Sequence, residues 1–290
     1  MAMGAADVVP GVSGGTVAFI TGIYEELIES LGAANMTAVK LLLGLRIKDL
    51  WQHLNGNFLV LVFSGILFSI FSLAKLISWA LITFPHIIWA YFFGLIAASV
   101  IYIARHAGLR DARNLIALGL GAVVAYSLTQ LTQVAVNPSI GFVFVAGAIA
   151  ICAMILPGIS GSFILVLLGM YQYIIAAVKE LDGAVLVVFA LGCISGLLTF
   201  THLLSWLLRR FHQLTLAVLT GFMVGSLAKV WPWKHLRDDG NGAREFNVWP
   251  NQYELLYQQD AQLLLVLLTL CLGIATVYTI DRFGNVRSGS

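Results

Sequence analysis

Long apolar stretches separated by short polar segments make up most of this chain. A membrane-spanning helix needs about 20 mostly apolar residues. Stretches of this kind predict spanning helices over approximately 58–81, 86–104, 112–136, 184–208, 214–231 and 262–280. The pattern therefore indicates a helical membrane protein with about six crossings.

Two further apolar zones, 8–28 and 140–178, are interrupted by glycine and proline. The second zone is too long for one helix and breaks at Pro157-Gly158. Irregular backbone at membrane depth is tolerated only where protein or a wet cavity surrounds it. We therefore predict a re-entrant hairpin in the second zone, and the same hairpin with a short leading arm in the first.

The two broken zones are copies of each other. Pro10-Gly11-Val12-Ser13-Gly14-Gly15 recurs 147 residues later as Pro157-Gly158-Ile159-Ser160-Gly161-Ser162, and the same offset relates Gly22 and Tyr24 to Gly169 and Tyr171. Later positions match at an offset of 127: Gly65, Ser78, Trp79, Phe84, Gly94 and Ser99 fall on Gly192, Ser205, Trp206, Phe211, Gly221 and Ser226. The difference of 20 indicates a longer linker at 35–55 in the first half.

Each half thus contains one broken hairpin and three spanning helices. Because three is odd, the second half must be inserted upside down, as in the inverted repeats of many secondary transporters. The predicted fold is an all-α integral membrane protein with two opposed re-entrant hairpins. Its two repeats are 1–136 and 137–290, and the second contains a polar external segment at about 234–260.

Composition supports this class of protein. Sixty per cent of the residues are hydrophobic and ten per cent are charged, whereas soluble domains carry about 25% charge. The net charge of +2 is too small to indicate a protein that binds nucleic acids. The cysteines lie in apolar stretches without metal-like spacing, so no metal or cofactor is expected. No cleavable signal peptide is expected before the first motif.

Cationic residues predict the orientation. If both hairpins are re-entrant, one side of the membrane carries ten of them: Lys40, Arg46, Lys48, Arg105, Arg110, Arg113, Arg209, Arg210, Arg282 and Arg287. The other side carries five: Lys179, Lys229, Lys234, Arg237 and Arg244. The positive-inside rule makes the first side, with the C-terminus, cytoplasmic.

The repeated turns have the chemistry of an anion site. Glycines let backbone N–H groups approach a ligand, serine and threonine add hydroxyls, and a phosphate is the natural guest. The candidate phosphate-binding residues are Gly11, Ser13, Gly14, Gly15, Thr16, Gly158, Ser160, Gly161 and Ser162. Tight helix packing also uses small residues, but two copies in apolar zones favour binding. Because inverted hairpins approach from opposite faces, we expect the two turns to meet near the midplane and share one phosphate.

Charged residues within apolar sequence are candidates for coupling or gating. Asp7, Glu25 and Glu26 flank the first turn. In the second half, Met154 and Gln172 occupy the positions of Asp7 and Glu25. Any H⁺ or Na⁺ coupling should therefore involve the first half. A capping role for Asp7 and a solvated hairpin end for the glutamates are the alternatives. Lys75 lies deep in a predicted helix, opposite His202 in the repeat, and snorkelling is its alternative role.

The stretch from Gly4 to Thr16, followed by Gly22-Ile23-Tyr24-Glu25, resembles the hallmark of the bacterial polyprenyl-phosphate transporter family. Leu156 to Ser162 resembles the second hallmark. The resemblance covers essentially the whole chain. It implies a flippase in the bacterial cytoplasmic membrane that moves undecaprenyl phosphate from the outer to the inner leaflet, for reuse in cell-wall synthesis, and not an enzyme. Its partners would be this lipid and the surrounding membrane lipids.

Two other functions fit parts of the pattern. A secondary transporter for a small anion would share the architecture without needing lateral access for a lipid tail. An intramembrane serine hydrolase of the rhomboid type would use Gly-x-Ser-Gly at Ser13 or Ser160, with His202 as the deep histidine that activates the serine. A hydrolase needs one nucleophile, so the duplication argues against this function.

Overall fold

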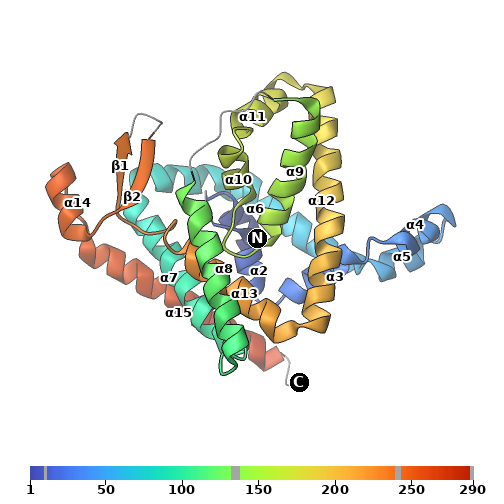
Figure 1. Ribbon diagram of the computed structural model, residues 1–290, viewed down its shortest axis with the longest axis horizontal. Helices are drawn as coiled ribbons and strands as arrows, with labels where there is room; N and C mark the ends of the chain where they lie inside the picture. Colours follow the sequence, from blue (N-terminus) through green and yellow to red (C-terminus); the bar gives the residue numbers. More distant parts are fainter. Residues whose placement is uncertain (10–11, 132–137, 239–242, 288–290) are drawn as a thin grey trace. The chain divides into compact units, whose positions relative to one another are not determined.

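The computed structural model describes residues 1–9, 12–131, 138–238 and 243–287, which are predominantly helical (Figure 1). Five helices are long and apolar enough to cross a membrane: Gly56–Thr83 (α6), Pro85–Ala104 (α7), Ala112–Gln130 (α8), Gly183–Arg210 (α12) and the segment Leu263–Ile280 of α15 (Leu263–Arg287). The described part of the chain is thus an all-α membrane protein, with one small two-stranded sheet.

The helices recur at the offsets seen in the sequence. Gly14–Ile20 (α2) and Gly161–Leu167 (α10) each follow a Gly-rich turn, and Tyr24–Gly32 (α3) and Tyr171–Glu180 (α11) begin 147 residues apart. Between them, Gly22 and Gly169 both have positive φ, +71° and +69°, a conformation that glycine adopts without strain. Helices α6 and α12 have 28 residues each and begin 127 residues apart.

Before each turn the two copies differ. Ala2–Asp7 (α1) has six residues, whereas its counterpart Ile140–Ile155 (α9) has sixteen. This difference agrees with the short leading arm predicted for the first hairpin. After each turn the hairpin has a second break, which the sequence did not predict: α10 and α11 meet at an angle of 108°.

The chain forms two compact units, and each collects corresponding parts of both repeats. The first comprises Met1–Ala74 and Gln133–Thr215, and the second comprises Lys75–Thr132 and Leu216–Ser290. The two broken hairpins therefore belong to the first unit, and the last two helices of each half belong mainly to the second. The assignment of 1–136 and 137–290 as inverted repeats stays a prediction.

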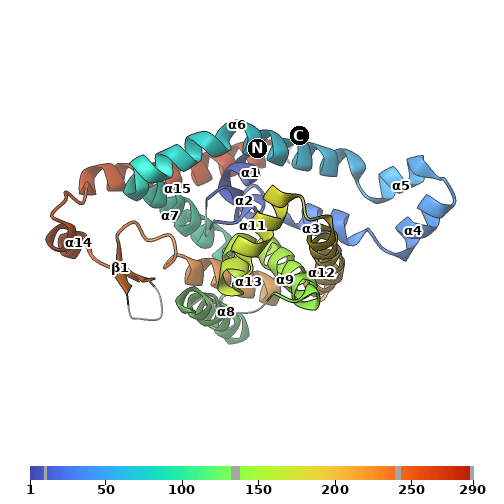
Figure 2. The same cartoon turned by 90° about the horizontal axis from the view of Figure 1, so that it is seen from above.

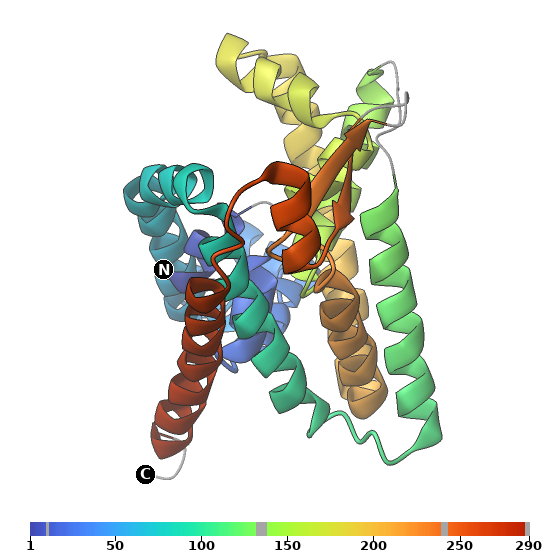
Figure 3. The same ribbon diagram turned by 90° about the vertical axis from the view of Figure 1, so that its left-hand side faces the viewer.

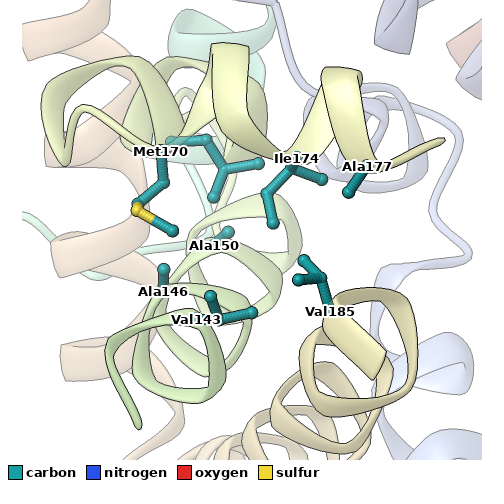
Figure 4. Packing of buried hydrophobic residues seen from close by; sticks show 8 residues of the cluster. Val143, Ala146, Ala150, Met170, Ile174, Ala177 and Val185 are labelled. Atoms are coloured by element: carbon teal, nitrogen blue, oxygen red, sulfur yellow. The ribbon is translucent and has the colours of Figure 1, made fainter. Parts of the chain in front are cut away.

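In the first unit, α9 and α12 lie side by side (Figure 1). A Cβ atom at Gly147 would lie 2.6 Å from the carbonyl oxygen of Phe189, so glycine permits this close backbone approach. Helix α11 folds over the same pair, with Met170, Ile174 and Ala177 on Val143, Ala146, Ala150 and Val185 (Figure 4). This buried apolar cluster fixes the second hairpin against its spanning helix.

In the second unit, α7 lies along α15, and His212–Ser226 (α13) lies along α8 (Figure 3). Glycines again allow contact between backbones: Gly94 and Gly273 lie where α7 meets α15, and Gly121 lies where α8 meets α13. Because α7 and α13 correspond in the repeat, these two helix pairs are related by the internal duplication.

The polar segment at 234–260 is folded. Lys234–Asp238 (β1) pairs antiparallel with Ala243–Asn247 (β2), and Pro250–Tyr257 (α14) follows. Trp233 and Tyr253 pack with Ala90 of α7 and with Ala261 and Val266 near the start of α15. Lys229 and Lys234 each contact Glu245 at 2.8 Å. The segment therefore forms a small polar cap on its own unit.

Two predicted spans are shorter in the structure. The helix predicted over 214–231 ends at Ser226, because the chain then turns through short-range hydrogen bonds such as Lys229 N–H to Ser226 O. This helix falls below the length of a clear span, so the described residues contain five spans, or six if the bent pair α10–α11 is one broken span. The helix predicted over 112–136 ends at Gln130, and 132–137 lie outside the described residues.

Candidate functional site

The first turn is held together by two side chains of its own segment. Asp7 Oδ1 accepts a hydrogen bond from the Gly14 N–H at 2.7 Å. Ser13 caps α2, and its Oγ accepts the Gly15 N–H at 3.1 Å. A Cβ atom at Gly14 would lie 2.6 Å from Asp7 Oδ2, so a larger residue would displace the carboxylate. These two N–H groups, which the sequence assigned to a phosphate, are therefore occupied by protein atoms.

In the second turn, as in the first, a serine with extended backbone precedes the helix, but the hydrogen bonds differ. Ser160 precedes α10, and its side chain makes no capping bond. The hydroxyls of Ser160 and Ser162 instead lie 2.8 Å apart and bond to each other. Gly158 has a positive φ of +89°, and a Cβ atom at Gly161 would lie 2.7 Å from the Ala150 carbonyl oxygen of α9. Because the two hydroxyls bond to each other and neither caps the helix, they are the polar side chains of this turn that can most readily turn to a ligand.

The two turns contact each other directly. Ser13 Oγ donates to the Met154 carbonyl oxygen at 2.9 Å, and the Gly158 N–H donates to Thr16 Oγ1 at 2.9 Å. A Cβ atom at Gly15 would lie 2.6 Å from the Ile155 carbonyl oxygen. Ser13, Thr16 and Ser160 are all buried. Polar residues from both copies of the motif thus meet inside one unit, although Gly11 lies outside the described residues.

The candidate acids are separated by the structure. Asp7 is partly buried and bonded to the first turn. Glu25 and Glu26 are exposed in the first turn of α3, where Glu25 Oε1 lies 2.9 Å from His212 Nε2 and Glu26 Oε1 accepts from Asn55 Nδ2 at 2.8 Å. Among the described residues, Asp7 is the one candidate acid that bonds to a motif turn.

Lys75 and His202 are the remaining candidates for coupling or gating. Both side chains are exposed on their helices, and His202 Nδ1 donates to the carbonyl oxygen of Leu198 in its own helix at 2.6 Å. Helices α6 and α12 are apolar on all sides, so their sequences do not show which face is packed. A gating role for these two residues stays a prediction.

Tyr24 is a residue of the motif that we did not assign to the site. Its side chain is 2% exposed, its ring meets Phe19 edge-on at 4.6 Å, and its hydroxyl has no hydrogen-bond partner among the described residues. A buried polar atom without a partner costs about 1–3 kcal/mol and calls for an explanation. The repetition of Gly22 and Tyr24 as Gly169 and Tyr171 was the signal available in the sequence.

The described residues contain no group of three or more His, Cys, Asp or Glu side chains that could hold a metal ion. The chemistry of the paired turns is therefore that of hydroxyls, backbone amides and one carboxylate. Such groups suit the binding of a phosphate by hydrogen bonds, and they include the one acid able to exchange a proton there.

Comparison with known proteins identifies the class. The profile of the family described as VCA0040-like, undecaprenyl phosphate translocase-like, matches residues 3–244. The chain belongs to this family, whose description is that of a translocase. The matched region includes both motif turns.

Two relatives give the resemblance a more specific form. A polyprenyl-phosphate transporter of Vibrio cholerae serotype O1 is 47% identical over 292 residues, which cover 98% of this chain and 95% of the relative. A polyprenyl-phosphate transporter of Staphylococcus aureus is 30% identical over 251 residues, which cover 80% of this chain and 83% of the relative. No solved structure matches the chain.

Proposed function

We propose that this protein is a flippase that carries undecaprenyl phosphate, or a related polyprenyl phosphate, from the outer to the inner leaflet of the bacterial cytoplasmic membrane. The observation that carries the proposal is the direct contact of the two repeated turns through Ser13–Met154 and Thr16–Gly158. The names of the two relatives support the same lipid. Recycling of the carrier lipid for cell-wall synthesis would be its role.

The physical task is to shelter a charged head group. An unpaired charge in hydrocarbon is very unfavourable, whereas the isoprenoid tail is as apolar as the bilayer and can stay there. One hydroxyl of the Ser160–Ser162 pair donates to the other, so the pair can direct its remaining O–H at one phosphate oxygen, and Thr16 retains its own O–H proton for another. The binding site is proposed to comprise these groups and the glycine backbone beside them.

The direction of transport sets an energetic requirement. A phosphate head group that moves inward carries negative charge toward a negative-inside cytoplasm, against about 2.3 kcal/mol per charge per 100 mV. Co-transport of H⁺ or Na⁺ would offset this cost. Asp7 is the first candidate for the coupling residue because it bonds to the turn, whereas Glu25 and Glu26 lie at an exposed helix end. The predicted topology leaves the C-terminus in the cytoplasm.

Reconstituted vesicles containing undecaprenyl phosphate test the proposal. A membrane-impermeant phosphatase added outside cleaves only the lipid in the outer leaflet, so translocation is measured as cleavage of the remainder. We expect the wild-type protein to expose the inner-leaflet lipid and protein-free vesicles not to. If the protein exposes no additional lipid, in the presence or absence of an ion gradient, the proposed function is wrong.

Variants connect the activity to the turns. Gly161→Leu should block the close approach of α10 to α9, and the double change Ser160→Ala with Ser162→Ala removes the hydroxyl pair without adding bulk. Gly119→Leu is the matched control, because nothing lies within 4 Å of its Cβ position. Normal transport by the double alanine variant would assign the turns to helix packing instead. Competition by excess inorganic phosphate would indicate a small-anion transporter.

A further inference from the structure

The linker at 35–55 forms two short helices that the duplicated architecture does not require. Met36–Leu43 (α4) and Ile47–His53 (α5) lie side by side beyond the end of α3 (Figure 2). In the second repeat, α11 ends at Glu180 and α12 begins at Gly183, so no counterpart exists there. We name this pair the α4–α5 hairpin. Because the second repeat lacks it, any function that it has is separate from the duplicated architecture.

Apolar side chains of the α4–α5 hairpin are exposed. Leu43 and Leu45 are 79% and 82% exposed, and Met36, Val39, Leu42, Ile47 and Trp51 are also exposed. Ala38 is its one buried residue among those described. Burial of a large apolar side chain stabilises a protein by about 1.5–3 kcal/mol, and a side chain left in water does not contribute this free energy. Such a surface would be costly in an aqueous loop, so it calls for an apolar environment.

The apolar residues of each helix share a face, and in α5 the polar residues lie on another. Met36, Val39 and Leu43 recur at intervals of three and four, which places them on one side of α4. In α5, Ile47 and Trp51 share a face by the same spacing, whereas Lys48 and Gln52 share another. Helix α5 thus has the division into faces that is typical of helices lying in a membrane interface. In α4, Lys40 lies at the edge of the apolar face, from which its long side chain can reach the head groups.

The hairpin is held at the level of a membrane surface by the helix that follows it. Helix α5 ends at His53, and the spanning helix α6 begins at Gly56. Trp51 Nε1 donates to Asn57 Oδ1 at 2.9 Å, and Gly56 leaves room for the indole ring, which a Cβ atom would meet. A tryptophan fixed at the mouth of a span is typical of the head-group region.

The charge of the hairpin selects the lipid. Lys40, Arg46 and Lys48 are exposed, and Asp49 pairs with Arg46 at 2.7 Å. No ion pair within the described residues involves Lys40 or Lys48. Two cations therefore remain for phosphate groups at the surface, which the distribution of positive charge predicts to be the cytoplasmic one. Each lysine near an anionic leaflet contributes about 1 kcal/mol of attraction.

We infer that the α4–α5 hairpin lies flat in the head-group layer of the cytoplasmic leaflet and binds its anionic lipids through Lys40 and Lys48. Its apolar face, centred on Leu43, enters the acyl boundary. The face of α5 that contains Gln52 stays in water. The inference does not depend on the transported substrate.

Spin labels test the placement in the full-length protein. In a variant with Cys152, Cys193 and Cys271 replaced by alanine, a nitroxide is attached at Leu43→Cys or, as the matched control, at Gln52→Cys. In nanodiscs we expect dissolved oxygen to speed the spin relaxation of the label at 43. A water-soluble nickel chelate should speed the relaxation of the label at 52. Equal nickel access at both positions overturns the inference. The inference is also overturned if neither reagent reaches the label at 43 and its spectrum is broadened by the label of a second copy, since this indicates a dimer interface.

Lipid composition tests the charge. We expect the label at 43 to move deeper when a third of the phosphatidylcholine is replaced by phosphatidylglycerol. The double change Lys40→Gln with Lys48→Gln should remove this response, and Lys179→Gln, which alters an exposed lysine of α11, should keep it. A depth that is the same in both lipid mixtures, or a response that survives the double change, overturns the assignment to anionic lipid.

Discussion

Thr16 Oγ1 accepts a hydrogen bond from the Gly158 N–H at 2.9 Å, across 142 residues of sequence. Together with the bond from Ser13 Oγ to Met154 O, it joins the two copies of the motif. Both Ser13 and Thr16 are buried, so neither bond can be replaced easily by water. The side chains that we proposed as phosphate ligands therefore also hold the two turns in register.

Thr16→Val should be destabilising, because it keeps the shape of the side chain but leaves the buried Gly158 N–H without an acceptor. The expected cost is about 1–3 kcal/mol. Thermal unfolding in detergent would show a lower midpoint, and translocation would fall. Thr16→Ser keeps the hydroxyl and should stay close to wild type in both measurements. An unchanged midpoint for the valine variant would contradict the importance of this bond.

Gly161→Ala tests the close packing of the second hairpin. Its Cβ atom would lie 2.7 Å from the Ala150 carbonyl oxygen, which belongs to the α9 backbone and cannot move freely. Overpacking of this kind typically costs about 1–3 kcal/mol. Gly141→Ala is the control in the same hairpin, because nothing lies within 4 Å of its Cβ position. The unfolding midpoint should fall for position 161 alone, and equal midpoints for both variants would count against the packing.

The sequence predicted the duplicated elements well, because turns and helix ends depend on local chemistry. Gly22 and Gly169 have nearly the same positive φ, and α6 and α12 have the same length. The orientation of the spanning helices was harder to predict. An all-apolar helix has no amphipathic face, so the exposure of Lys75 and His202 on their helices could not be predicted from the sequence.

The candidate site was predicted in part. The two turns were expected to meet, and the structure brings Ser13, Thr16 and Gly158 together. The bond from the Gly14 N–H to Asp7 agrees with the capping role that the sequence offered as an alternative for this residue, although the sequence did not show which amide it would cap. Tyr24 was also missed, since burial of a tyrosine hydroxyl follows from tertiary packing and has no local signature.

Glu245 should make the polar cap sensitive to acid. Burial alone would raise the pKa of this carboxyl, but Lys234 and Lys229 together lower it from 4.5 to about 2. A lowered pKa in the folded state stabilises the cap fully above pH 4.5, and the contribution is lost as the pH falls toward 2. Since Lys234 also lies 5.1 Å from the centre of the Trp89 ring, tryptophan emission should report the change.

Glu245→Gln should shift this emission already at pH 7, because both lysines lose their carboxylate. The variant should then show little of the acid transition that the wild-type protein shows between pH 4.5 and 2. Glu180→Gln, an exposed position of α11, serves as the control and should titrate like the wild type. Wild-type emission at pH 7 in the Glu245 variant would mean that the ion pairs do not hold the cap.

Protonation of Asp7 is the step by which proton binding could be coupled to phosphate binding. Its carboxylate occupies the Gly14 N–H at 2.7 Å, so a phosphate that uses this amide must first displace it. An ionised acceptor makes a much stronger hydrogen bond than a neutral one. Protonation of Asp7 should therefore release the amide and favour phosphate binding. A proton and a phosphate would then bind together, as coupled inward transport requires. Met154 at the equivalent position offers no such group.

Asp7→Asn separates the charge from the geometry, because the amide oxygen can still accept the Gly14 N–H. We expect this variant to translocate lipid down a gradient while losing the acceleration that an imposed proton gradient gives the wild-type protein. Glu25→Gln and Glu26→Gln are the matched controls at the exposed end of α3 and should keep that acceleration. A gradient response that survives in Asp7→Asn would assign the coupling to another residue. Wild-type transport that ignores both proton and sodium gradients would make the protein a passive flippase, whose direction is set by consumption of the lipid at the cytoplasmic face.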